Sequence, residues 1–135
     1  MLPPNGPVDV HTLIWDQIRT LRTMGIEVIF STTGPRTVTP HSFNAAMREA
    51  FVNIHKYADP QQPVTVSLDT SCGVHLEVEN SERSISRDRV ISSQLGIAQH
   101  ATKLHLEGGR MKVYNHGKTW RVSLEHPRSE RTETK

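Results

Sequence analysis

The chain of 135 residues is poor in cysteine and contains no long hydrophobic stretch. Its only cysteine, Cys72, excludes an internal disulfide and a cysteine-rich zinc site, and this usage is typical of a reducing compartment. No run approaches the roughly 18 to 20 apolar residues of a membrane-spanning helix, and the first residues lack the pattern of a secretory signal. We therefore expect a cytoplasmic segment that does not enter a membrane; a membrane anchor elsewhere in a longer protein stays open.

Neither sign of charge dominates the sequence. It has 16 Lys and Arg against 14 Asp and Glu, a net charge of +2, and part of the excess lies in residues 128–135. Such a balance without a basic cluster does not indicate nucleic-acid binding. The Walker A loop, the G-x-G-x-x-G loop, the H-E-x-x-H zinc motif and the G-x-S-x-G elbow are also absent. The commonest phosphate-binding, zinc-peptidase and hydrolase motifs are thus excluded.

What is present is enough sequence for one domain with a hydrophobic core. Residues 1–8 are Pro- and Gly-rich and are predicted to be a leader or linker, whereas residues 128–135 have no apolar side chain and are predicted to be a disordered tail. Residues 9–127 then form the domain. Apolar spacing predicts helices at residues 10–24, 40–58 and 95–107, and strands at residues 26–31, 64–68, 74–78, 111–114 and 119–124.

Two further local features complete the predicted fold. Thr39 is expected to cap the central helix with its hydroxyl, and the polar residues 80–94, which have no clear period, are expected to form a mobile loop. The helices are separated by hairpins as well as by single strands. This order favours an α+β fold, a two-layer sandwich in which about three helices cover one face of a mixed, mostly antiparallel sheet.

The central helix carries the most informative polar residues. Glu49, Asn53 and Lys56 are spaced i, i+4 and i+7, so they share one side of the helix. Carboxylate and amide oxygens are ligands that Mg²⁺ prefers, and an ammonium group can neutralise a phosphate. The row therefore suits a magnesium-bound phosphate compound. The alternative interpretation is an ordinary solvated helix face with one Glu–Lys pair.

The same helix begins a resemblance to a known family. Residues 48–58 read R-E-A-F-V-N-I-H-K-Y-A, which is similar to the N-box pattern R-E-A-L-T-N-x-x-K-H-A. Residues 96–113, G-I-A-Q-H-A-T-K-L-H-L-E-G-G-R-M-K-V, and residues 117–127, G-K-T-W-R-V-S-L-E-H-P, are similar to the closing motifs of that family. The chain resembles the ATP-binding catalytic domain of bacterial sensor histidine kinases of the NarL/DesK type, within the GHKL superfamily of ATPases. The resemblance covers about residues 8–127 and implies the Bergerat type of ATPase fold.

This resemblance implies roles for individual residues. Asn53 would hold Mg²⁺ between the nucleotide phosphates, Glu49 would orient a water molecule or the metal shell as the catalytic acidic residue, and Lys56 would neutralise phosphate charge. Asn80 falls where the family has the Asp that accepts from the adenine amino group, and an amide oxygen can accept the same bond. The remaining nucleotide-binding positions implied by the family motifs are Tyr57, Gly96, Ile97 and Thr119. Gly96 would bring a helix start close to the phosphates.

The sequence also departs from the family in its glycines. Residues 81–83, Ser-Glu-Arg, replace the glycine expected after Asn80, and residues 81–94, the expected lid over ATP, contain no glycine. Gln94 and Gln99 stand where the family tends to have glycine. Because a Cβ obstructs close backbone approach, these changes weaken the expectation of tight nucleotide binding. Glu82 is expected to repel a nucleotide.

Three functional hypotheses follow. The first is a histidine kinase catalytic domain that binds ATP and Mg²⁺, delivers the γ-phosphate to a histidine on the separate dimerisation domain of the same kinase, and acts on a response regulator only indirectly. The second is a degenerate domain of the same fold that binds a partner protein with little or no nucleotide. The third is an anti-sigma-factor kinase. His11 lacks the acidic flank of a phosphoacceptor and is expected to be an ordinary surface residue.

Overall fold

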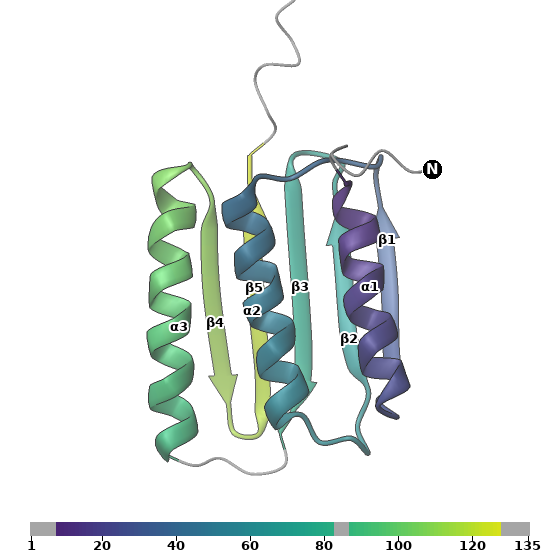
Figure 1. The fold of residues 1–135 in the computed structure, drawn as a ribbon, viewed down its shortest axis with the longest axis vertical. Coiled ribbons are helices and arrows are strands. Elements are labelled where there is room, and N and C mark those ends of the chain that lie inside the picture. Colours follow the sequence, from purple (N-terminus) through teal and green to yellow (C-terminus); the bar gives the residue numbers. More distant parts are fainter. Residues whose placement is uncertain (1–7, 83–86, 128–135) are drawn as a thin grey trace, which may run out of the picture.

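The computed structural model describes residues 8–82 and 87–127, and for residues 87–95 it describes the backbone only. Helices and strands follow one another in the predicted order (Figure 1). The helices are α1 (Val10–Thr23), α2 (His41–Tyr57) and α3 (Arg87–Leu106), and the strands are β1 (Val28–Thr33), β2 (Val64–Asp69), β3 (Val74–Ser81), β4 (Arg110–His116) and β5 (Thr119–His126). The predicted leader, apart from Val8, and the predicted tail lie outside the described residues.

The five strands form one sheet in the order β1-β2-β3-β5-β4. β1 and β2 are parallel, since α2 crosses over between them, and the other neighbouring pairs are antiparallel. Figure 1 shows all three helices on the same face of the sheet. The predicted α+β sandwich with a mixed, mostly antiparallel sheet is therefore confirmed.

The hydrophobic core lies between the helices and this one face. β2 alternates strictly, with Val64, Val66 and Leu68 buried and the residues between them exposed. The apolar stripe of α2 packs onto the same layer, where its side chains from Phe43 to Ile54 are almost fully buried. Each of the large apolar side chains among them, such as Phe43 or Ile54, contributes about 1.5–3 kcal/mol by leaving water. The opposite face of the sheet is open to solvent and mostly polar, with Ile29 and Tyr114 as exposed exceptions.

Three sequence predictions are wrong in detail. α3 begins at Arg87 instead of residue 95, because residues 87–95 contain neither Pro nor Gly and nothing interrupts the helix that Gly108 ends. Thr39 does not cap α2: Pro40 occupies the N-cap position, and the Thr39 hydroxyl donates to Asn44 Oδ1. His11 is not a surface residue, since only 7% of it is exposed.

Candidate functional site

The end of α2 and the end of β3 are joined by backbone contacts. The Asp59 N–H donates to the Ser81 carbonyl at 2.8 Å, and Ala58 and Glu82 form an isolated antiparallel bridge. These contacts bring the C-terminal half of α2 and the last residues of β3 to the same end of the domain, the lower end in Figure 1. The predicted site residues of both elements therefore lie in one region.

The predicted row on α2 does not point into bulk water along its whole length. Asn53 is buried, with 5% of its surface exposed, and its Nδ2 donates to the Glu49 carbonyl at 3.2 Å. Glu49 and Tyr57 are half-buried, whereas Lys56 is exposed. A buried amide one turn from a half-covered carboxylate is uncommon for an ordinary solvated face. The row is therefore not solvated along its whole length, and its role as a site stays a prediction.

Asn80 is the second buried amide in this region. It lies near the end of β3, on the helix-covered side of the sheet, opposite Trp120 of β5, and only 3% of it is exposed. Its Nδ2 donates to the Ser81 carbonyl at 3.2 Å, and among the described residues its Oδ1 has no hydrogen-bond partner. A buried acceptor without a donor costs about 1–3 kcal/mol. A bound water molecule or a ligand can supply the missing donor.

α3 lies directly against α2 at Gly96. A Cβ on Gly96 would be 2.8 Å from Glu49 Oε2, and His100, one turn later, places Nε2 3.8 Å from Glu49 Oε1. Ile97 is partly buried and packs against the core. Gly96 therefore allows the close approach of the two helices. It is not at a helix start as predicted, because α3 begins nine residues earlier, so the argument from free N–H groups at a helix N-terminus does not apply to it.

Two other predicted residues lie differently from the rest. Thr119 pairs with Ser81, so its side chain is on the open face of the sheet, away from Asn80 and the helices. The structure does not bring Thr119 to the other predicted residues. Glu82, expected to repel a nucleotide, is buried to 2% exposure beside the end of α2, and its backbone N–H donates to the Lys118 carbonyl at 2.9 Å. Residues 83–86 of the predicted lid lie outside the described residues.

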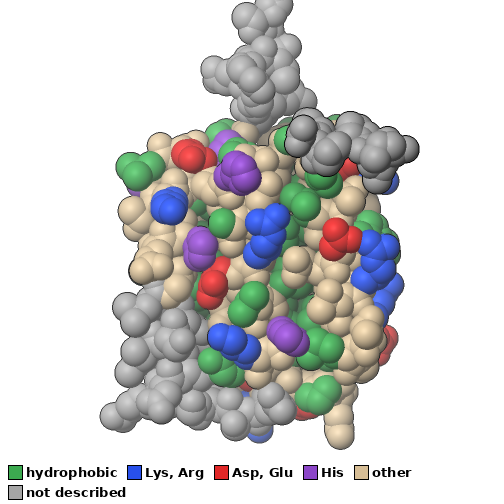
Figure 2. All heavy atoms as spheres, in the orientation of Figure 1, with side chains coloured by type: hydrophobic (Ala, Val, Ile, Leu, Met, Phe, Trp, Pro, Cys, Tyr) green, Lys and Arg blue, Asp and Glu red, His purple; other side chains and the backbone are tan. Residues whose placement is uncertain are grey.

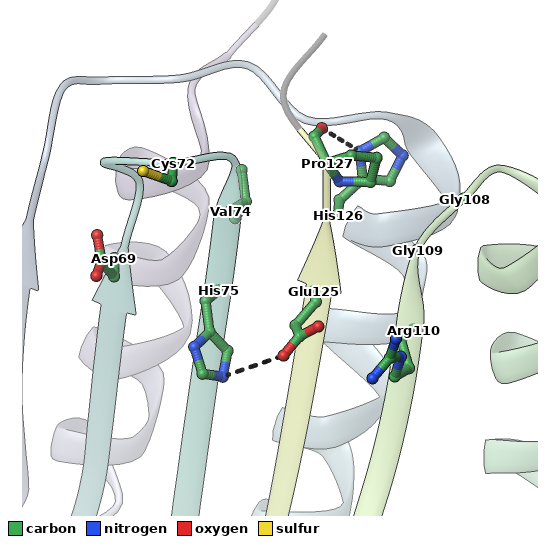
Figure 3. Close-up of a pocket in the computed structure, with 10 residues that line it drawn as sticks. All are labelled: Asp69, Cys72, Val74, His75, Gly108, Gly109, Arg110, Glu125, His126 and Pro127. Atoms are coloured by element: carbon green, nitrogen blue, oxygen red, sulfur yellow. Dashed lines mark hydrogen bonds and ion pairs between the residues drawn. The ribbon is translucent and has the colours of Figure 1, made fainter.

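Sequence reasoning missed a polar cavity at the opposite end of the sheet (Figure 3). It has a volume of about 400 Å³, and the strand register places Asp69, His75, Glu125 and Arg110 in one cross-strand row on the open face. His75 Nε2 lies 3.1 Å from Ser123 Oγ and 3.9 Å from Glu125 Oε2. The alternation of each strand was visible in the sequence, but the row depends on which strands pair.

Hydrogen bonding lowers the pKa of Asp69 in this row, chiefly through the Ser71 backbone N–H. Asp69 therefore stays ionised at neutral pH. Within the two described segments, no three His, Cys, Asp or Glu side chains are grouped so that they could hold a metal ion. Any metal at the candidate site would depend on the Asn53 amide and the Glu49 carboxylate, which are oxygen ligands of the kind that Mg²⁺ accepts together with water and phosphate.

Comparison with known proteins identifies solved structures that share this fold. No protein-family model and no curated protein matches the sequence. Solved structures do match. One is a mycobacterial sensor histidine kinase, MprB, with 19% identity and a TM-score of 0.66, and the match covers 90% of this chain and 96% of that one. Another is the nucleotide-free catalytic domain of the histidine kinase ThkA, with 15% identity and a TM-score of 0.61, and the match covers 90% of this chain and 95% of that one. The histidine kinase AdeS of Acinetobacter baumannii also matches, with 11% identity and a TM-score of 0.63, and the match covers 90% of this chain and 66% of that one.

The fold is that of histidine kinase catalytic domains. This chain spans 66% of the AdeS chain that it matches and nearly all of the MprB and ThkA chains. At identities between 11% and 19% the likeness concerns the fold, and the activity has to be argued from the site. None of the helices formed by residues 8–82 and 87–127 is long and apolar enough to cross a membrane.

Proposed function

We propose that residues 9–127 are the ATP-binding catalytic domain of a cytoplasmic two-component sensor histidine kinase. The observation that carries the proposal is the pair of buried amides, Asn53 on α2 and Asn80 on β3, on two elements that meet at one end of a histidine kinase catalytic fold. Of the two amides, Asn80 has an Oδ1 without a hydrogen-bond partner among the described residues, and a nucleotide bound there gives this oxygen a donor.

Each residue then has a task that its chemistry allows. Asn80 Oδ1 accepts from the amino group of the adenine base, and the exposed ammonium of Lys56 neutralises phosphate charge. Asn53 and Glu49 supply oxygen ligands to Mg²⁺, which would neutralise the phosphates when bound. The contribution of this chain to phosphoryl transfer is positioning and charge stabilisation, as in other phosphoryl-transfer enzymes. Tyr57 and Ile97 are further nucleotide-binding positions in this proposal, and Ile97 also packs against the core.

The acceptor in this proposal is a histidine on the dimerisation domain of the same kinase, and a response regulator acts downstream of it. The assignment to the NarL/DesK type rests on the similarity of residues 48–58 to the N-box pattern of that type. Because the acceptor histidine belongs to another domain, this segment alone binds ATP without completing the transfer.

Isothermal titration calorimetry with Mg²⁺-ATP tests the proposal. We expect saturable binding in the micromolar to millimolar range, and we expect EDTA or Asn53→Ala to weaken it about tenfold or more, because both remove phosphate-side interactions. Asn115→Ala, an exposed amide in β4, is the matched control and should bind like the parent. No heat at millimolar nucleotide would contradict the proposal, provided that circular dichroism shows a folded protein.

The second candidate is a degenerate domain that binds a protein partner instead of a nucleotide. It is favoured by the contact between Gly96 and Glu49, because α3 already covers the carboxylate that would face the metal. The buried Glu82 beside the end of α2 also favours it, since a carboxylate near phosphates is repulsive. Absence of nucleotide heat together with a folded parent protein would select this candidate.

A further inference from the structure

The N-terminal half of α2 and the C-terminal half of α3 border a groove that the candidate site does not use. The groove has a volume of about 520 Å³. It lies toward the upper end of the helical face, where Figure 2 shows Lys, Arg and His side chains along both helices. The lining residues are His41, Ser42, Ala45, Arg48, His100, Lys103, Leu106 and Glu107.

The charge of the groove is predominantly positive. Arg48 and Lys103 are exposed on its two sides, and neither makes an ion pair or hydrogen bond with another described residue. The one carboxylate that lines it, Glu107, already accepts a hydrogen bond from the Ser42 hydroxyl. The Ser42 hydroxyl is neutral and leaves the charge of Glu107 unchanged, so the groove carries two cations against one carboxylate.

The groove also has apolar surface. Leu106, in the last turn of α3, is 79% exposed, the highest value among the exposed large hydrophobic residues of the described chain. On α2, Ala45 lines the groove, and Val52, seven residues later on the same side of the helix, lies beyond the lining residues and is 41% exposed. Apolar side chains between unpaired cations are typical of a protein-binding surface.

We propose that this groove binds an acidic amphipathic helix of a partner protein. A third helix fits between two neighbouring helices with its apolar stripe on Ala45, Val52 and Leu106, and its carboxylates then face Arg48 and Lys103. Neither end of the given sequence resembles such a helix: residues 1–7 carry no charged side chain, and residues 128–135 carry more basic than acidic groups and no apolar one. The proposal does not depend on nucleotide binding.

Fluorescence anisotropy with a designed peptide tests this inference on the full chain. The probe is a labelled helical peptide of about 18 residues, long enough to follow five helical turns, with Leu on one side and Glu flanking it. The comparison peptide carries Lys in place of every Glu. At about 50 mM salt we expect the Glu peptide to bind at least about tenfold more tightly than the Lys peptide, and we expect added salt to weaken binding.

A variant in which the two cations of the groove are replaced by carboxylates tests the charge requirement most directly. Arg48→Glu with Lys103→Glu should weaken binding of the Glu peptide about tenfold or more and should restore binding of the Lys peptide, a reversal that a merely misfolded variant would not show. Lys112→Glu with Lys118→Glu, two exposed lysines of the β4–β5 hairpin, is the matched control and should bind like the parent.

Three outcomes would overturn the inference. They are equal binding of the two peptides, equal weakening by the control variant, and self-association of the parent chain through this face in sedimentation equilibrium, abolished by the Arg48 and Lys103 reversals.

Discussion

At the scale of single residues, Asn80 is the buried amide that the proposed function explains best. Asn53 and Asn80 are 5% and 3% exposed, in a protein that also buries other polar groups, such as Thr70 and Glu82. The cost is clearest at Asn80, since its Oδ1 is an acceptor without a donor among the described residues. Natural proteins keep such groups where function requires them and lose stability in exchange. A ligand donor at Asn80 accounts for the group.

Asn80→Leu tests this exchange between stability and function. Leu has a similar volume and no polar atom, so we expect the free energy of unfolding to rise by about 1 kcal/mol or to stay unchanged. We also expect affinity for ATP to fall about tenfold or more, because the base loses its acceptor. Urea denaturation and calorimetry measure the two quantities. A loss of stability with unchanged ATP affinity would assign Asn80 a purely structural role.

At the scale of elements, the helix boundaries that could be predicted from the sequence are those marked by a capping residue or a helix-breaking residue. α1 follows its prediction closely because Asp9 caps it and Gly25, at φ +90°, ends it. The α2 stripe and the burial of Asn53 follow from a spacing that is visible in the sequence. The start of α3 was missed, since the predicted loop contains no breaker, and with it the position of Gly96 inside a helix was missed.

The cap of α1 gives a prediction about pH. Burial raises the pKa of Asp9, but hydrogen bonds from the Thr12 N–H and hydroxyl, together with Arg36, lower it by more. A carboxyl whose pKa is lower in the folded state contributes stability above its unfolded pKa of about 3.9 and loses it as pH falls through the folded value. Asp9→Ala should therefore cost about 1 kcal/mol at pH 7, and this difference should shrink below about pH 4.

Chemical denaturation at pH 7 and at pH 3 measures the effect of Asp9→Ala. Asp16→Ala is the control, because Asp16 is exposed in the middle of α1 and its pair with Arg19 is a surface contact. It should change stability by no more than about 0.5 kcal/mol. A cost for Asp9→Ala that is the same at both pH values would show that the carboxylate charge contributes nothing to the cap.

At the scale of the whole molecule, the helices cover one face of the sheet and leave the other face uncovered (Figure 1). The element order and fold class could be predicted from hydrophobic period alone. The strand order β1-β2-β3-β5-β4 could not, because long-range pairing is not written in any local pattern. For the same reason the sequence could not place Thr119 on the open face or bring His75 and Arg110 to one cavity.

This arrangement separates three surfaces. The candidate nucleotide site lies where α2 and β3 end, the proposed protein groove lies between the opposite halves of α2 and α3, and the polar cavity around His75 lies at the far end of the open face. Nucleotide binding where α2 and β3 end is the central claim, and the residues that a nucleotide contacts can be identified one by one.

Two-dimensional ¹⁵N NMR of the full chain, titrated with Mg²⁺ and a non-hydrolysable ATP analogue, measures that location most directly. We predict saturable shifts confined to the backbone amides around Glu49–Tyr57, Asn80–Glu82 and Gly96–Ile97. Shifts centred on His75 and Arg110, or no shifts at millimolar analogue, would contradict the claim.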